Sequence, residues 1–324
     1  MMHPSMETLW QIAQKINTER CFLSFNEPMA LHTTFRIGGP ADLYLRPRTI
    51  PALAEVMTVL ADEKVPWVLL GGGANVLVGD RGIRGAVIDT GLLASMRLVR
   101  EIHEASAGQG LYLLEAECGV SVGTLCEEAL IHSLSGLEAF YGMPGSVGGA
   151  VYMNARCYEE DISAHLASLT AISPQGTMVR LEPASLSWEY KRSPFQAQGT
   201  HAGWTVAAAA FRLQSEDARA IAFRMREKMA DRLRKHHFDF PSAGSVFKNN
   251  RAFGKPTGKL LDELGLRGFR IGDAMVSPWH ANIFINAGKA RACDMRQLIE
   301  FAQNEALAKL GLSLELEILF LGEF

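Results

Sequence analysis

Two glycine-rich segments constrain the fold of this chain more than any other feature of its sequence. The first reads LGGGANVLV at residues 70–78, directly after an apolar run, and the second reads GMPGSVGGA at residues 142–150. Closely spaced glycines accept positive φ angles and let the backbone approach a ligand closely, so successive N–H groups can converge on an anion. A tight turn explains either segment alone equally well. Two such segments in one part of the chain favour a ligand that carries phosphate.

The spacing of the glycines excludes two common nucleotide-binding motifs. Neither segment contains the G-x-G-x-x-G of a Rossmann fold. GKPTGK at residues 254–259 has the wrong glycine spacing for a P-loop, and Leu260 stands where a hydroxyl residue is needed. The chain lacks H-E-x-x-H, so zinc-protease chemistry has no support. The sequence also gives no sign of a histidine paired with a serine, so serine-hydrolase chemistry has none either. SAGSVFKN at residues 242–249 gathers hydroxyl, amine and amide groups, but as a pattern alone it indicates a loop more readily than a site.

The arrangement of apolar runs predicts an α+β protein of two domains. Residues 41–215 alternate short apolar runs with glycine-rich punctuation, as α+β domains do. A polar helix is expected over residues 218–234 and would lead into a second domain, because 324 residues exceed what one core usually holds. We therefore expect domains at residues 1–217 and 218–324.

Local patterns predict individual elements. An amphipathic helix should follow Ser5, and SPQG at residues 173–176 should close a β-hairpin. A long helix should begin at Asp294 and end before Gly311, a typical C-cap residue. A last strand is expected over residues 314–321, with acidic side chains on one face and apolar ones on the other.

The composition points to a protein of the cell interior. The net charge is −3, and no run of about 18 apolar residues occurs. The five cysteines are scattered without a C-x-x-C pair, which argues against disulfides and zinc and suits a reducing compartment. The first residues lack the pattern of a secretion signal. We expect a cytoplasmic protein without metal, nucleic-acid or membrane contacts, and we interpret the basic stretch at residues 224–237 as a solvated helix face.

Several motifs occur in a fixed order and together resemble one enzyme family. They are the two glycine-rich segments with TTFRIGGPA at residues 33–41 before them, and GSVFKN at 244–249, RIG at 270–272 and HAN at 280–282 after them. This set resembles the UDP-N-acetylenolpyruvoylglucosamine reductase (MurB) family over about residues 26–322. The resemblance implies an FAD-binding domain of the vanillyl-alcohol-oxidase (PCMH) type, followed by a smaller α/β substrate-binding domain.

The resemblance also implies a reaction in two halves. NADPH gives a hydride to FAD and leaves, and UDP-N-acetylglucosamine enolpyruvate then binds in the same cleft. The hydride passes to the vinyl terminus of the enolpyruvyl group, and a serine protonates the neighbouring carbon. The product is UDP-N-acetylmuramate, a precursor of peptidoglycan. Both substrates are small molecules, and no protein partner is expected.

The functional positions of the family fall on three groups of residues here. The resemblance implies catalytic roles for Ser245, Glu317 and Lys191 and substrate contacts for Tyr190, Asn249 and His280. A glutamate beside a carboxylate substrate should be partly protonated or paired with a cation. The residues expected to contact FAD are Gly71, Gly72, Gly73, Ala74, Asn75, Val76, Leu77, Met143, Pro144, Gly145, Ser146, Gly148, Gly149 and Asn154. We expect the FAD pyrophosphate to lie against the backbone N–H groups of residues 71–75 and 145–149.

The sequence departs from the family pattern near the expected site. Lys191 stands where the family has its catalytic arginine, and Arg156 and Glu159 replace two glycines. A lysine supplies positive charge but not the two-pronged contact of an arginine. A buried lysine can also lose its proton, so we expect activity to fall at alkaline pH.

The adjacent Arg192 offers an alternative cation. If residues 188–193 are extended, Lys191 should point into the cleft and Arg192 away from it, because neighbouring side chains of an extended chain face opposite sides. A bulge near Pro194 would instead bring Arg192 inward.

Two other functions stay open at this point. A different flavin oxidoreductase of the same fold would bind flavin without responding to a UDP-sugar. It would not account for GSVFKN around Ser245 or for LELEI at residues 314–318, which contains Glu317 and resembles the terminal motif of the family. A non-catalytic nucleotide-binding protein is conceivable because of the departures, and NADPH would not bleach it.

Overall fold

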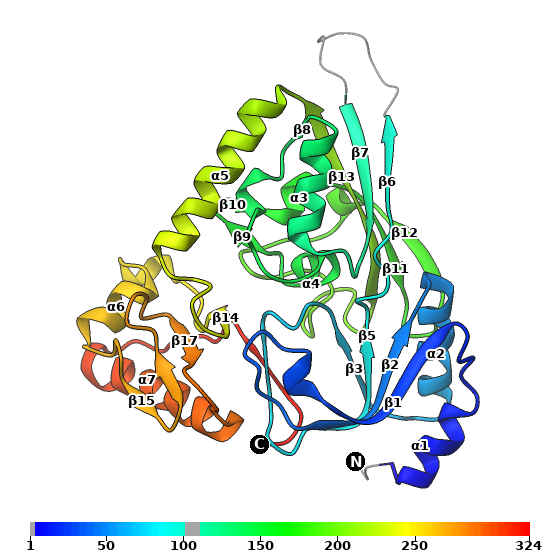
Figure 1. The fold of residues 1–324 in the computed structure, drawn as a ribbon, viewed down its shortest axis with the longest axis horizontal. Helices are drawn as coiled ribbons and strands as arrows, with labels where there is room; N and C mark the ends of the chain where they lie inside the picture. The colour runs from blue at the N-terminus through cyan, green and yellow to red at the C-terminus, as the bar shows by residue number, and fades with distance from the viewer. Residues whose placement is uncertain (1–3, 101–110) are drawn as a thin grey trace.

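The computed structural model describes residues 4–100 and 111–324. Residues 1–3, on which part of the expectation about a secretion signal rests, lie outside this range. Within it the strands form one six-stranded sheet, two four-stranded sheets and two strand pairs, with helices packed against them (Figure 1). Short 3₁₀ helices occur at η1 (Met29–Leu31), η2 (Glu138–Phe140), η3 (Ile162–His165), η4 (Pro183–Ser185) and η5 (Arg251–Phe253).

The first sheet has the strand order β1-β2-β5-β3. Its strands are β1 (Cys21–Pro28), β2 (Pro40–Pro47), β3 (Trp67–Leu70) and β5 (Ile83–Asp89). The last three run parallel to one another, whereas β1 is antiparallel to β2. Helices α1 (Met6–Ala13) and α2 (Ile50–Asp62) bury Leu9 and Leu53 in one core with Ile88 of β5. The first glycine-rich segment begins where β3 ends.

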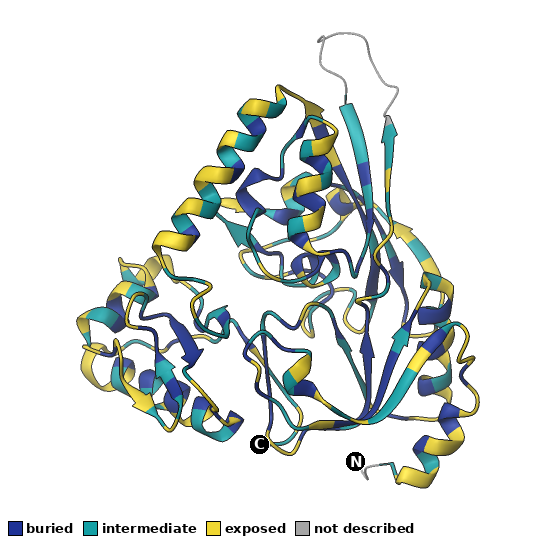
Figure 2. Cartoon of the chain, viewed as in Figure 1, coloured by how far each residue is buried: buried dark blue, intermediate teal, exposed yellow. Residues whose placement is uncertain are grey.

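The second sheet is antiparallel, in the order β12-β11-β13-β7-β6, with β8 also paired to β13. Helix α4 packs against β13 and β7, and α3 and α5 pack against each other. Figure 2 shows α5 with its exposed residues on the outer face. Because α4 begins inside the second glycine-rich segment, at Val147, this sheet positions that segment. The elements are β6 (Met96–Arg100), β7 (Leu111–Glu117), α3 (Val122–Ile131), β8 (Leu134–Ser135), α4 (Val147–Tyr152), β9 (Arg156–Cys157), β10 (Glu160–Asp161), β11 (Leu166–Ile172), β12 (Met178–Leu181), β13 (Thr205–Ser215) and α5 (Ala218–Arg234).

The third sheet has the antiparallel order β14-β17-β16-β15. Helix α7 packs on β15 and β16 and buries Met295 and Leu298 in the core of this part. The elements are β14 (Ser242–Ser245), α6 (Thr257–Glu263), β15 (Arg270–Ile271), β16 (Ala274–Val276), β17 (Ile283–Asn286) and α7 (Ala292–Leu310).

The end of the chain returns to the first glycine-rich segment. Strand β18 (Leu319–Leu321) runs parallel to β4 (Val76–Val78), which directly follows those glycines. Just after β4, the Asp80 carboxylate accepts hydrogen bonds from the N–H groups of Ala292 and Cys293 at 2.7 and 2.9 Å. These contacts fix the third sheet against the first. The division of the chain at residues 217 and 218 stays a prediction.

Most predictions about individual elements are confirmed. The Ser5 hydroxyl accepts from the N–H of Thr8 at 3.1 Å and caps α1. Helix α5 has the predicted bounds of 218–234. In the predicted hairpin, the N–H of Gly176 donates to the carbonyl of Ser173 at 2.9 Å between β11 and β12.

Two predicted boundaries are wrong. Helix α7 begins at Ala292 rather than at Asp294, because the Asp80 carboxylate satisfies the first N–H groups from outside the helix. The last strand covers residues 319–321 instead of 314–321. The residues before it still alternate, with Leu314 and Ile318 buried, but they form only single backbone contacts with residues 246–248.

Candidate functional site

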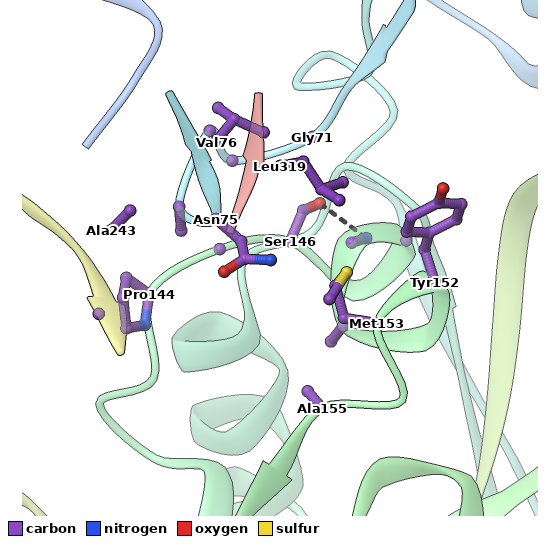
Figure 3. Close-up of a pocket in the computed structure, with 18 of the residues that line it drawn as sticks. Gly71, Asn75, Val76, Pro144, Ser146, Tyr152, Met153, Ala155, Ala243 and Leu319 are labelled. Atoms are coloured by element: carbon purple, nitrogen blue, oxygen red, sulfur yellow. Dashed lines mark hydrogen bonds between the residues drawn. The ribbon is translucent and has the colours of Figure 1, made fainter. Parts of the chain in front are cut away.

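One cavity of about 620 Å³ collects residues from all three sheets and the segments between them. Figure 3 shows residues of both glycine-rich segments around it, among them Asn75, Pro144 and Ser146. Most of the predicted site residues line this cavity: Gly71, Gly72, Gly73, Ala74, Asn75, Val76, Met143, Pro144, Gly145, Ser146, Gly148, Gly149, Lys191, Ser245, His280 and Glu317.

The two glycine-rich segments pack directly on each other. A Cβ atom on Gly72 would lie 2.7 Å from the Cα of Gly145. One on Gly73, whose φ is +61°, would lie 2.0 Å from the backbone oxygen of His32. Both positions therefore require glycine, and this wall of the cavity is made of backbone.

The two segments differ in the donors that they offer. Among the described residues, no group accepts a hydrogen bond from the N–H groups of residues 71–75. In the second segment, Val147 and Gly148 donate to the carbonyls of Val120 and Cys118 at 2.8 Å, and Gly149 donates to the Ser146 hydroxyl at 3.3 Å. The expectation that N–H groups throughout residues 145–149 are available for phosphate is therefore wrong for these three.

Lys191 lies in a tight turn, so the expectation of an extended segment at 188–193 is wrong. The backbones of Glu189 and Arg192 exchange hydrogen bonds at 3.1 and 3.0 Å, and Lys191 has a φ of +56°. Its Nζ lies 2.5 Å from Oε1 of Glu317 inside the cavity. The Arg192 side chain is 51% exposed and does not line the cavity. Lys191 therefore points into the cavity and Arg192 away from it, as predicted, but through a turn and not through an extended chain.

Three side chains hold this turn against the end of α4. The Asn154 carboxamide, which is fully buried, donates to the Glu189 carbonyl at 2.8 Å. Ser193 donates through its hydroxyl to the Tyr152 carbonyl at 2.6 Å, and the Gln196 carboxamide donates to the Lys191 carbonyl at 3.3 Å. These bonds fix the place from which the Lys191 side chain enters the cavity.

Glu317 and Ser245 come from neighbouring backbone segments. The N–H of Glu317 donates to the Val246 carbonyl at 2.8 Å, and the Asn75 carboxamide donates to the Glu317 carbonyl at 2.9 Å. Buried Asn282 holds the other side of this segment, since its amide bonds both the N–H and the carbonyl of Phe247. The Ser245 hydroxyl lines the cavity and forms no hydrogen bond with another described residue.

The Lys191–Glu317 pair determines the charge in this part of the cavity. Burial alone would lower the pKa of Lys191, but the attraction and hydrogen bond of Glu317 outweigh it and raise this pKa above its ordinary value. Lys191 is therefore charged at neutral pH. Of the two states expected for Glu317, pairing with a cation is the one observed.

Four predicted site residues do not line the cavity. Leu77 is buried in a core, and Asn154 acts on the Lys191 turn as described. Tyr190 is exposed at the surface, with 39% of its area accessible. Asn249 is exposed as well, and its carboxamide oxygen accepts from the N–H of Thr257 at the start of α6 (2.9 Å). The roles of these residues toward FAD or substrate stay predictions.

The cavity also contains residues that the sequence interpretation missed. Arg232 and His237 line it, so residues 224–237 are not only a solvated helix face. The signal was present in the sequence: Arg232 follows Ile221 and Met225 on the buried stripe of α5, at helical spacing. Burial, followed by the positive charge of Arg232, lowers the pKa of His237 to about 4. Burial also lowers the pKa of His280.

The two lost glycines are accommodated by an ion-paired hairpin. Glu159 keeps the left-handed conformation of a glycine, with a φ of +73°. Arg156, which lines the cavity, contacts Glu159 at 2.8 Å and Asp161 at 2.7 Å. The charges of the two substitutions therefore largely cancel each other.

Comparisons with known proteins identify the family. Residues 41–182 match the FAD binding domain family, and residues 236–321 match the C-terminal domain of UDP-N-acetylenolpyruvoylglucosamine reductase. The reductase of that name from Treponema denticola is 40% identical over 310 residues, covering 93% of this chain and 94% of that protein. The one from Borreliella burgdorferi is 38% identical, covering 91% and 93%.

A solved structure agrees. The enzyme of this name from Thermus caldophilus superposes with a TM-score of 0.74 at 31% identity, covering 93% of this chain and 99% of that one. The chain belongs to the UDP-N-acetylenolpyruvoylglucosamine reductase family. It therefore has the fold of these reductases, an FAD-binding domain of the vanillyl-alcohol-oxidase (PCMH) type with a smaller α/β domain after it.

The residues present fit the FAD that reductases of this family use. Both glycine-rich segments lie inside the part that matches an FAD-binding domain. They form a backbone wall in which a Cβ at Gly72 or Gly73 has no room, and residues 71–75 keep their N–H groups free for an anion within the described structure.

Three findings concern other site types in residues 4–100 and 111–324. No helix there is both long and apolar enough to cross a bilayer. No group of three or more His, Cys, Asp or Glu residues is arranged to hold a metal ion. All five cysteines are free.

Proposed function

We propose that Lys191, Ser245 and Glu317 act together on the enolpyruvyl group in the reaction of the reductase family. The chain is an FAD-dependent oxidoreductase that uses NADPH to reduce UDP-N-acetylglucosamine enolpyruvate to UDP-N-acetylmuramate, a step in the synthesis of peptidoglycan precursors. FAD, when bound, carries the hydride from NADPH to the vinyl terminus of the substrate. The observation that carries the proposed residue roles is the Lys191–Glu317 contact inside a cavity that Ser245 also lines.

Ser245 is proposed to protonate the carbon next to the vinyl terminus. Hydride addition leaves negative charge that spreads from this carbon onto the neighbouring carboxylate, and a proton must quench it. The Ser245 hydroxyl has no hydrogen-bond partner among the described residues, so its proton is free for a ligand. A serine is a weak acid, and positive charge nearby has to stabilise the alkoxide that it becomes.

Lys191 supplies that positive charge. Its ammonium carries three N–H donors, and Glu317 Oε1 is its one side-chain partner among the described residues. The remaining donors can meet the carboxylate of the substrate as charge develops there. Glu317 holds the ammonium in place and keeps it protonated.

The substrate residues and the cellular setting are part of the proposal. His280 is proposed to contact the sugar nucleotide because it lines the cavity, while Tyr190 and Asn249 are retained only from the family resemblance. The division into domains at residues 1–217 and 218–324 and a cytoplasmic location are also proposed, the latter because precursor synthesis uses NADPH. We propose no protein partner.

Stopped-flow absorbance of the flavin tests the function. NADPH should bleach the oxidised holoenzyme in the absence of oxygen, and UDP-N-acetylglucosamine enolpyruvate should then restore the oxidised spectrum. A flavin that NADPH reduces but the UDP-sugar does not reoxidise would favour another flavin oxidoreductase of this fold. A protein that NADPH does not bleach would favour a non-catalytic nucleotide-binding role.

A further inference from the structure

Arg232 is a buried cation without an acidic partner on the wall of the cavity. Its side chain belongs to the last turn of α5, and the residue is only 8% exposed. Its Nε donates to the Tyr141 carbonyl at 3.1 Å, and an Nη donates to the Cys157 sulfur at 3.4 Å. Across residues 4–100 and 111–324, no carboxylate lies within ion-pair distance of its guanidinium.

The other lysine and arginine side chains that line the cavity are compensated. Lys191 pairs with Glu317, and Arg156 pairs with Glu159 and Asp161. The partners of Arg232 in the described structure are all neutral: the two hydrogen-bond acceptors and the Tyr158 ring, whose centroid lies 5.5 Å from its Cζ. A buried charge that lacks an opposite charge recovers only part of the hydration that it loses. Lys191 and Arg156 each pair with a carboxylate, whereas Arg232 pairs with none among the described residues. We therefore expect an anionic ligand to neutralise the charge of Arg232.

The surroundings of Arg232 favour an anion. His237 and His280 line the same wall, and their rings lie 6.0 Å apart in an edge-to-face arrangement. Burial and then the unbalanced charge of Arg232 lower the pKa of His237 to about 4, with smaller contributions of the same sign from His280 and Lys235. Asp231 opposes them only weakly, since it already pairs with Lys235 at 2.6 Å. The potential at this wall is therefore positive.

We propose that Arg232 binds the diphosphate of the sugar nucleotide. A guanidinium presents parallel N–H donors that match two phosphate oxygens. Arg232 lies on the wall that it shares with His280 and β14, which belong to the part matching the reductase C-terminal domain. Its side chain also packs on Gly142, at the start of the second glycine-rich segment, where a Cβ would lie 3.0 Å from the Arg232 Cδ. The FAD pyrophosphate is assigned to the unbonded N–H groups of residues 71–75, which leaves the guanidinium for the second diphosphate. The inference rests on the proposed function, because that function supplies a diphosphate ligand to this cleft.

A comparison of UDP with uridine tests the contact. Both are titrated against the oxidised holoenzyme, with the flavin spectrum as the readout, in the wild type, Arg232→Gln and Arg232→Lys. We expect UDP to bind Arg232→Gln about 10–100-fold more weakly while uridine binds almost as before, since the diphosphate alone loses a charge-assisted hydrogen bond. Arg232→Lys keeps the charge but not the two-pronged geometry, so its affinity for UDP should lie between those of the wild type and Arg232→Gln.

Arg234→Gln is the matched control. Arg234 lies on the same helix but is exposed and paired with Asp231, so its replacement should leave both affinities unchanged. Equal weakening of UDP and uridine in Arg232→Gln would mean a structural role and would overturn the proposal, as would unchanged UDP affinity. Weakening of NADPH alone, or loss of flavin from Arg232→Gln but not from Arg232→Lys, would assign the charge to another ligand. Reoxidation of the wild-type flavin by the enolpyruvyl substrate tests the proposed function separately.

Discussion

Replacing Lys191 with methionine should affect stability and one half-reaction, whereas the same change at Arg192 should affect neither. Methionine keeps the length of the side chain and removes only its charge. In the wild type, Lys191 Nζ contacts Glu317 at 2.5 Å, and the two side chains are 14% and 13% exposed. The nearest carboxylate oxygens to Arg192 are 3.7 and 3.8 Å away on exposed side chains.

The magnitudes follow from this difference in burial. Removing one member of a buried ion pair costs about 3–5 kcal/mol, and we expect the lower end for Lys191→Met because the pair faces a cavity. An exposed pair contributes at most about 1 kcal/mol, so Arg192→Met should melt close to the wild type. Loss of the cation that faces developing charge should slow flavin reoxidation by about 10²–10³-fold. Reduction of the flavin by NADPH does not need this charge and should change much less.

The pH dependence gives a second readout of Lys191. Its pKa is raised in the folded protein, so the stability from the pair is fully present below the ordinary lysine pKa and is lost as pH rises through the higher folded value. The rate of flavin reoxidation should therefore stay constant between about pH 7 and 10 and fall only above that range. The loss of activity at alkaline pH that burial alone would cause is shifted to higher pH by the pair with Glu317. The Lys191→Arg variant should remain active at still higher pH, because a guanidinium keeps its proton there.

Stopped-flow measurement of both half-reactions, with melting of the holoenzyme, decides the matter. If Arg192→Met abolished reoxidation while Lys191→Met reacted at nearly the wild-type rate, the assignment of the cation would be wrong and the arginine would have the catalytic role. Equal slowing of both half-reactions in Lys191→Met would mean that the variant perturbs the flavin site in general.

Four further predictions concern separate contacts. Ser245→Ala should slow reoxidation by about 10²–10⁴-fold and leave reduction by NADPH nearly intact in stopped flow, and equal effects on both would exclude Ser245 as the proton donor. Asn154→Gly, in which glycine tolerates the φ of +41° at this position, should lower the free energy of unfolding by about 1–3 kcal/mol and slow flavin reoxidation. In the Lys191→Met background the same change should not slow reoxidation any further, because both residues act through one turn. Asp80→Ala should lower the melting temperature through a loss of about 1–2 kcal/mol, because two N–H groups of α7 lose their acceptor; an unchanged melt would refute the capping role. Because the pKa of His237 is lowered to about 4 in the fold, stability should be greatest above pH 6.5 and decline between 6.5 and 4. His237→Gln should flatten that decline in denaturant titrations at each pH.

The parts of the fold that the sequence predicted are those set by local chemistry. The helix over 218–234 follows from its composition, and the hairpin at 173–176 follows from its turn residues. The glycine-rich segments were predicted to form a ligand site because glycine, unlike other residues, leaves room for close backbone contacts. The approach of Gly72 to Gly145 is such a contact. The helix, the hairpin and each glycine-rich run depend on residues close together in the chain, so single-sequence reasoning reaches them. The contact between Gly72 and Gly145 joins distant residues and was not predicted.

The missed features depend on contacts between distant residues. Nothing near Asp294 reveals that Asp80, more than 200 residues earlier, satisfies the first N–H groups of α7. The turn at Lys191 was missed for the same reason. A lysine has no local preference for a positive φ, and the turn is held by hydrogen bonds from the distant Asn154 and from Gln196. The match of Lys191 to the arginine position of the family therefore predicted which cation enters the cavity, but not the backbone conformation that brings it there.

Arg232 shows how a local interpretation can miss a functional residue. In a helix rich in charged residues, one more arginine indicates a solvated face unless its position is compared with the apolar stripe. Arg232 lies on that stripe with Ile221 and Met225, where burial without a carboxylate would be unfavourable in a protein that bound nothing. A charged residue at a buried helical position is thus a signal for a ligand when the rest of the sequence offers it no partner. In this chain the partner is expected to arrive with the substrate, which is why the sequence contains only half of the contact.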